Sequence, residues 1–315
     1  MNKITVIGSG SVGSTIAYTL TVMGLVSEIV MIDINQEKSL GEALDIRQGV
    51  PFCNPANVYA GSYADAKDSD IVIITSGVAR KPGQSRLDLA QTNVNILKMV
   101  AKEIVKHAPN ATYIIVSNPV DVLTYVFHKI SGIPEEKIIG SGTILDTARL
   151  RARISEYYDV NQKNVHAYIL GEHGDSAFVP WSVANISNVP IDDYRNAIIS
   201  GGKANYPEFD HDEVENYVRK SGARVIQRKG ATFYAVSMSV CHICKCLLSG
   251  IDTTMTVSTM LHGEYGIDDV CLSLLTVVGN KGAHSKVLLP LNEKEVEALR
   301  HSADCLKEII NQIEI

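Results

Sequence analysis

The sequence predicts an α/β fold in which a doubly wound parallel sheet is followed by an α+β domain. Short apolar runs alternate with helix-like stretches in the first half of the chain, at residues 3–7, 28–33, 70–75 and 112–117. These runs are continuously apolar, which is typical of parallel strands that are buried on both faces. Strands separated by helices indicate right-handed βαβ units.

Apolar periodicity predicts the helices. Residues 14–25 fit one helix, and residues 87–105 carry apolar side chains at helical spacing on one face. Between the third apolar run and the second of these helices, residues 77–86 hold two glycines, a proline and three basic residues, which predicts an exposed, movable loop. The second half is less regular, with long helix-like segments at 212–248 and 293–315. We place a domain boundary between residues 141 and 142.

Composition limits the classes of partner. The 315 residues carry a net charge of -6, so the chain lacks the basic surface that nucleic acids and anionic membranes attract. It has no apolar run that could cross a bilayer and no signal peptide, so we expect a cytoplasmic protein. Cys241, Cys244 and Cys246 lie close together, but no second pair accompanies them. We therefore expect buried thiols rather than a metal site or disulfides.

A glycine motif indicates the cofactor. Gly8, Gly10 and Gly13 form G-x-G-x-x-G directly after the first predicted strand and before a predicted helix. In a Rossmann-type fold these glycines make the tight turn, admit the pyrophosphate and pack the helix on the strand. Asp33 follows the next strand, 20 residues after Gly13, where an acid accepts hydrogen bonds from the adenosine ribose. An acid there repels a 2′-phosphate, so the sequence predicts NAD rather than NADP.

Four polar residues predict acid–base chemistry on a carboxylate substrate. His173 lies between glycines in a turn, and its near-neutral pKa suits a general acid. Asp146 and Arg149 are three residues apart and share one face of a predicted helix, so the acid is placed to orient His173 and the arginine to grip a carboxylate. Asn118 follows a strand at the edge where ligands bind in open α/β sheets.

At these residues the chain resembles the L-lactate/malate dehydrogenase family, and within it the bacterial L-lactate dehydrogenases. The likeness covers essentially the whole chain. Its matching pieces lie at residues 8–13, 33, 80–86, 117–121, 145–149, 171–175 and 229–232. The resemblance implies a hydride transfer between NAD and a small 2-hydroxy/2-oxo acid, carried out by a Rossmann domain (1–141) and a substrate domain (142–315).

The resemblance also implies roles for individual residues. His173 is the proton donor, Asp146 its partner, and Arg149 the anchor of the substrate carboxylate. Arg86 polarises the reacting carbonyl when the loop closes, and Asn118 and Thr232 contact the substrate. Residues expected along the NAD, besides the three glycines and Asp33, are Val12, Lys38, Tyr63, Gly77, Asn118 and Ser141. A non-catalytic NAD-binding protein would lack at least one of the catalytic residues, and all are present.

The residues leave open which of two acids, pyruvate or oxaloacetate, is the substrate. Arg80 stands where lactate enzymes of the family usually carry Gln and malate enzymes Arg. An arginine there suits the second carboxylate of oxaloacetate and is costly against the methyl of pyruvate. Thr232 and residues 85–89 and 171–176 favour lactate, so we expect an L-lactate dehydrogenase. Malate or dual specificity is the alternative.

Two further residues resemble an effector site. Arg151 and His166 match the pair that binds fructose 1,6-bisphosphate in allosteric bacterial lactate dehydrogenases, where two cationic groups hold a phosphate. Relatives with this pair are usually tetramers, so the resemblance implies a homotetramer. Each residue also has a simpler interpretation, as a solvated helix arginine and as a histidine at a strand end.

Overall fold

The computed structural model describes residues 2–79, 85–198 and 206–315. Within these residues nine strands form one sheet, in the order β12-β11-β10-β6-β5-β4-β1-β2-β3. Its strands are β1 (Lys3–Ile7), β2 (Glu28–Ile32), β3 (Asn57–Ala60), β4 (Ile71–Ile74), β5 (Thr112–Ile115), β6 (Ile138–Gly140), β10 (Thr253–His262), β11 (Asp268–Gly279) and β12 (Gly282–Lys286). A small sheet contains β7 (Val165–His166), β8 (Asn185–Ile186) and β9 (Val189–Pro190).

The first six strands are parallel, as the sequence predicts. β1 pairs with β2 on one side and with β4 on the other, so the chain winds outward in both directions from the centre. Ile71, Ile73 and Ile74 are at most 1% exposed, which explains why these strands lack a polar alternation. The doubly wound sheet is therefore confirmed, and β3 and β6 are two strands that the apolar runs did not predict.

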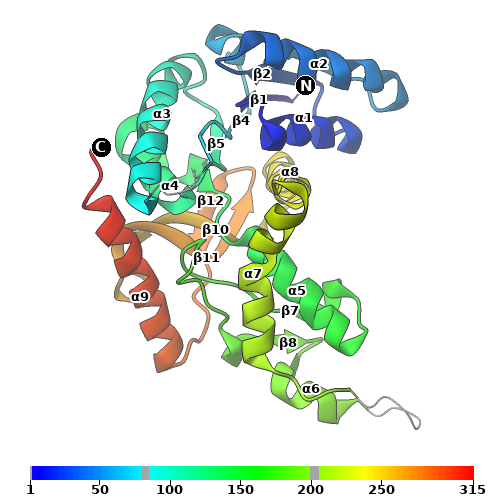
Figure 1. Ribbon diagram of the computed structural model, residues 1–315, viewed down its shortest axis with the longest axis vertical. Helices are drawn as coiled ribbons and strands as arrows, with labels where there is room; N and C mark the ends of the chain where they lie inside the picture. The colour runs from blue at the N-terminus through cyan, green and yellow to red at the C-terminus, as the bar shows by residue number, and fades with distance from the viewer. Residues whose placement is uncertain (1, 80–84, 199–205) are drawn as a thin grey trace.

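Helices cover both faces of this sheet (Figure 1). The helices are α1 (Ser11–Met23), α2 (Gln36–Gly49), α3 (Arg86–His107), α4 (Val120–Ser131), α5 (Ile144–Tyr158), α6 (Ile191–Ala197), α7 (His211–Lys229), α8 (Tyr234–Leu248) and α9 (Glu293–Ile310). Apolar residues of α1, α2 and α8 form one core cluster, and those of α3, α4 and α9 form a second. The C-terminus lies beside α3, where the Glu314 amide donates to Gln91 Oε1 at 2.9 Å.

The second half differs from the expectation in three places. β10 and β11 form a long antiparallel hairpin that extends the parallel sheet through Ser258 and Gly140, where the sequence indicated only irregular structure. The helix-like segment 212–248 is two helices, because Gly230 ends α7 with a φ of +84° and α8 begins only at Tyr234. The last helix ends at Ile310 rather than at the chain end.

The corner between α7 and α8 places Thr232 in a turn rather than inside a helix. Lys229 Nζ lies 3.4 Å from the ring centre of Phe233 and 3.8 Å from that of Tyr234, so cation–π contacts support the corner. α7 then runs away from α8 along α5 (Figure 1). The corner therefore faces the edge of the sheet where the strands β4, β5 and β6 end.

The cysteines lie where the sequence placed them. Cys241, Cys244 and Cys246 are buried in α8, and all six cysteines are free thiols. Burial raises the pKa of Cys241 to about 12 and that of Cys244 far above its usual range, so both are neutral packing groups. Among the helices that the structure describes, none combines the length and apolar character of a membrane span.

Candidate active site

The glycine motif forms the turn between β1 and α1. Gly8 has a φ of +102°, a conformation that favours glycine, and a Cβ at Gly13 would lie 1.8 Å from the Gly8 carbonyl oxygen. Gly10 is the N-cap of α1, and a Cβ there would meet no atom of the described residues within 4 Å. Gly8 and Gly13 are thus required by the fold itself, whereas Gly10 leaves open space at a helix N-terminus, where phosphates bind.

Substituting Gly13 and Gly10 by alanine, one at a time, is expected to separate folding from cofactor binding. Gly13→Ala should lower the free energy of unfolding by about 1–3 kcal/mol, because its methyl group overlaps the backbone of residue 8. Gly10→Ala should leave the melting temperature almost unchanged and weaken NADH binding roughly tenfold, because the methyl group occupies the space for the pyrophosphate. Thermal unfolding and NADH fluorescence titration measure the two effects. Unweakened NADH binding by Gly10→Ala would contradict this placement.

Asp33 lies directly beside the glycine turn. Its Oδ2 accepts the Ser9 amide at 2.6 Å and its Oδ1 accepts the Asn35 amide at 2.8 Å, so the carboxylate is fixed at the end of β2. A carboxylate has lone pairs beyond these two bonds, and they remain available to a ribose hydroxyl. Tyr63 is close enough for the charge of Asp33 to help raise its pKa, after the larger effect of burial. Lys38 is exposed on the first turns of α2.

A cavity of about 540 Å³ lies between the end of the parallel sheet and α7. It contains most of the residues that the sequence predicts for substrate and nicotinamide: Val12, Gly77, Asn118, Ser141, Asp146, Arg149, His173 and Thr232. These residues come from separate segments of the chain. The fold therefore assembles the predicted residues around one space.

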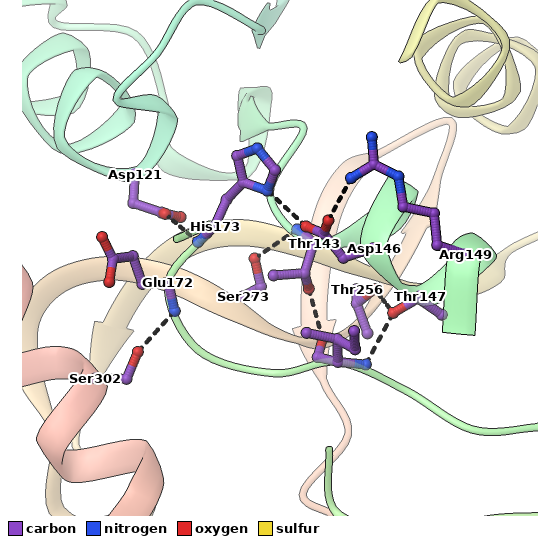
Figure 2. Close-up of polar contacts among 11 residues, drawn as sticks. Asp121, Thr143, Asp146, Thr147, Arg149, Glu172, His173, Thr256, Ser273 and Ser302 are labelled. Atoms are coloured by element: carbon purple, nitrogen blue, oxygen red, sulfur yellow. Dashed lines mark hydrogen bonds and ion pairs between the residues drawn. The ribbon is translucent and has the colours of Figure 1, made fainter. Parts of the chain in front are cut away.

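His173, Asp146 and Arg149 form a continuous hydrogen-bonded chain (Figure 2). His173 Nδ1 lies 2.5 Å from Asp146 Oδ2, and Arg149 Nη1 donates to Asp146 Oδ1 at 2.9 Å. Because Asp146 occupies Nδ1, the other ring nitrogen of His173 is the one that remains for a ligand. The i,i+3 spacing on α5 thus gives the shared face that the sequence predicts.

Charges around His173 favour its protonated form. Burial by itself lowers the pKa of His173, but the carboxylates of Asp146 and Asp121 outweigh it, so the net pKa lies above its usual value. The reverse holds for Asp146. Burial raises its pKa, but His173 and Arg149 lower it further, and the group stays ionised. Both pKa shifts therefore favour the charged pair of a carboxylate and an imidazolium.

Arg86 begins α3 and is not among the described residues that line the cavity, although its partner Asp175 is. Its guanidinium pairs with Asp175, and both side chains are largely exposed. Hydrogen bonding to Asp175 raises the pKa of Arg86, so the guanidinium stays charged. Ser85 and Asp88 form a capping box that fixes the start of the helix. Arg80 lies outside the described residues.

The sequence assigned no role to two polar residues that shape the site. Asn93 on α3 accepts the Val78 amide at 2.8 Å and donates to the Asn118 carbonyl at 2.7 Å. It therefore connects Val78, near the start of the predicted loop, to Asn118, a predicted substrate contact. Asp121 accepts the backbone amide of His173 at 2.7 Å. A buried polar residue in a helix that otherwise shows a regular apolar face is the signal that could have indicated Asn93.

The predicted effector residues, Arg151 and His166, are not among the described residues that line the cavity. Arg151 donates from Nε to the Ala167 carbonyl at 3.0 Å and lies over the ring of Tyr168. Burial lowers the pKa of Arg151 from its usual value. His166 directly precedes Ala167 and is exposed on β7.

Two family models match the chain from end to end. Residues 2–140 match the lactate/malate dehydrogenase NAD-binding domain, and residues 143–315 match the lactate/malate dehydrogenase α/β C-terminal domain. Together with the cavity and its hydrogen-bonded histidine, these matches define an NAD-dependent oxidoreductase. The chain belongs to the lactate/malate dehydrogenase family.

Individual relatives are similar over their whole length. The chain is 46% identical to the L-lactate dehydrogenase of Thermoanaerobacter pseudethanolicus, over 100% of both chains. It is 44% identical to that of Acetivibrio thermocellus, over 100% of this chain and 98% of the relative. The structure of a minor L-lactate dehydrogenase from Enterococcus mundtii has a TM-score of 0.94 at 35% identity, covering 100% of this chain and 99% of that one.

Proposed function

We propose that this chain reduces pyruvate to L-lactate with NADH and catalyses the reverse oxidation. The observation that carries the proposal is the hydrogen-bonded chain of His173, Asp146 and Arg149 in one cavity with Asn118 and Thr232. A proton donor and a carboxylate anchor side by side suit a 2-oxo acid, in which the carboxylate and the ketone are adjacent. Relatives named L-lactate dehydrogenase at 44–46% identity support lactate.

The residues present fit NAD. The open space at Gly10 suits a pyrophosphate, and the carboxylate of Asp33 suits a ribose. Val12, Gly77 and Ser141 line the cavity. We propose that Lys38 and Tyr63 flank the adenosine side. When bound, NADH supplies the hydride.

The remaining steps belong to this chain's own side chains. Arg149 binds the substrate carboxylate through its guanidinium fork, and Asn118 donates to the substrate oxygen. His173 protonates the same oxygen from its free ring nitrogen, while Asp146 stabilises the imidazolium. Arg86 leaves Asp175 and brings a second positive charge to the oxygen as negative charge develops there.

The proposal extends to an effector, to the oligomeric state and to the location of the protein in the cell. Arg151 and His166 bind fructose 1,6-bisphosphate, and the chain assembles as a homotetramer in the cytoplasm. The bond from Arg151 Nε to the carbonyl of Ala167, the residue next to His166, supports the effector site. The net charge of -6 supports the view that neither nucleic acids nor membranes are partners.

Parallel assays of pyruvate and oxaloacetate reduction test the substrate. We expect a higher kcat/KM with pyruvate for the wild type. Arg80→Gln should raise this preference by roughly tenfold, because it removes a cation that only a second carboxylate would pair with. If oxaloacetate is preferred by orders of magnitude and Arg80→Gln abolishes the preference, the chain is a malate dehydrogenase instead. Comparable values for both acids indicate dual specificity.

The same assay with fructose 1,6-bisphosphate tests the effector. We expect activation of the wild type and none of Arg151→Gln, with Arg47→Gln as a matched control at an exposed position in the last turn of α2. Equal rates with and without the bisphosphate would contradict the proposed effector site.

A further inference from the structure

A second buried carboxylate faces the catalytic histidine from the side opposite Asp146 (Figure 2). Asp121 lies in the first turn of α4, and its side chain is 2% exposed. Its Oδ2 accepts the backbone amide of His173 at 2.7 Å, across a sequence separation of 52 residues. Its Oδ1 makes no well-formed hydrogen bond within the part of the chain that the structure describes, and its polar neighbour is the hydroxyl of Ser258 on β10.

A structural role alone does not explain an acid at this position. A neutral Asn has the same shape and accepts the same amide bond through its side-chain oxygen. Burial of an ionised carboxylate with few hydrogen bonds is costly, so in a purely structural position the uncharged residue is the more stable choice. The position in the first turn of α4 gives the acid only a small helix-dipole stabilisation.

The negative charge of Asp121 acts on the imidazole of His173. Asp146 and Asp121 both raise the pKa of His173, and they act against burial and against the positive charge of Arg149. Burial raises the pKa of Asp121 to about 6, and a nearby carboxylate, Glu172, adds to this effect. Asp121 is therefore ionised in the neutral range, where His173 has to remain protonated to donate.

Few other titratable groups face this pair of residues from the surrounding elements. They are Asp146 and Arg149 from α5, Glu172 from the turn that holds His173, and Cys271 from β11. The thiol of Cys271 has a pKa far above its usual range because it is buried, so it adds no charge. The neighbour from β10 is the hydroxyl of Ser258, which lowers the pKa of Asp121. The charges that act on the ring are those of Asp146, Asp121 and Arg149, while Glu172 acts on Asp121.

We propose that Asp121 is a positioning residue that fixes the backbone of His173 and, through its negative charge, stabilises the protonated ring together with Asp146. The inference rests on the proposed role of His173 as proton donor. In this arrangement Asp146 sets the orientation of the ring, and Asp121 extends the pH range over which the ring holds its proton. The burial of Asp121 keeps the charge poorly solvated and so strengthens its field at the imidazole.

The pH profile of Asp121→Asn tests this assignment. Reduction needs protonated His173, so kcat/KM falls as pH rises through the pKa of that ring. Removing the charge should lower this pKa, so that the fall begins at lower pH. We expect kcat/KM near the wild-type value at pH 6 and a loss at pH 8 of roughly three- to tenfold. Thr124→Ser, a buried change one turn along α4, should leave the profile unchanged.

A second readout is independent of activity. NMR titration of ¹⁵N-histidine-labelled protein, with the His173 signal assigned from its absence in His173→Asn, should show a lower pKa in Asp121→Asn. Asp121→Ser, which leaves room for water at the amide, serves if the Asn variant does not fold. An unshifted His173 titration in a folded variant, or a loss that is equal at every pH, would overturn the proposal. Absence of 2-oxo acid reduction by the wild type with a shifted titration would instead refute only the proposed function.

Discussion

His173→Asn is expected to lower kcat/KM for pyruvate reduction by roughly three orders of magnitude, within the range that general acids contribute. Asn is of similar size and can still donate to Asp146, so the hydrogen-bonded chain from Asp146 to Arg149 survives. It cannot carry a proton to the substrate oxygen. The ketone then has to be protonated by water in a cavity from which loop closure expels water.

NADH binding separates this chemical effect from a folding defect. The turn that holds residue 173 is fixed by backbone contacts, because Asp121 accepts the residue 173 amide and Ser302 accepts the Glu172 amide at 2.8 Å. We therefore expect an unchanged NADH affinity and an unchanged melting temperature. His301→Asn, an exposed substitution on α9, is the matched control and should retain full activity. A His173→Asn variant that keeps more than about a tenth of wild-type kcat/KM would show that another group donates the proton.

Local sequence patterns predicted the parts of the site that depend on neighbouring residues. The Gly8–Gly13 turn is a strand–turn–helix feature, and the contact between Asp146 and Arg149 follows from helical spacing alone. The four predicted strands were found because parallel strands buried on both faces need continuous apolar runs. Each of these features depends on short-range geometry, which the order of the residues determines.

The remaining features depend on contacts between distant segments. Asp121 meets His173 only because the first turn of α4 lies beside the turn that holds His173 in the folded chain. The β10–β11 hairpin carries apolar, β-branched runs, but Ser and Thr interrupt them, and they become buried against α4, α5, α8 and α9. The break at Gly230 could have been predicted, since a glycine near the end of a helical pattern is a common C-cap. The resemblance to a family, rather than the spacing, supplied the roles of Arg86 and Thr232.

Arg149→Lys is expected to lower kcat/KM for pyruvate by roughly a hundredfold, mainly through KM, because a charged hydrogen bond of the fork is lost. Arg149 Nη1 is bonded to Asp146, and a Cβ at Gly222 would lie 3.9 Å from its Nη2 and 4.0 Å from its Nη1. The guanidinium is thus held by Asp146 and faces a position of α7 that carries no side chain. A lysine ammonium cannot present two parallel donors to a carboxylate.

Arg153→Lys provides the matched control for this prediction. Arg153 lies one turn further along α5, pairs with Glu156 and Glu213, and is not among the described residues that line the cavity. The same substitution there should leave both kcat and KM close to wild type. Affinity for oxamate, a pyruvate analogue that is not reduced, measures carboxylate binding without chemistry and should fall in parallel for Arg149→Lys. If oxamate affinity is unchanged while kcat falls, Arg149 acts through Asp146 on the protonation of His173 and does not anchor the substrate.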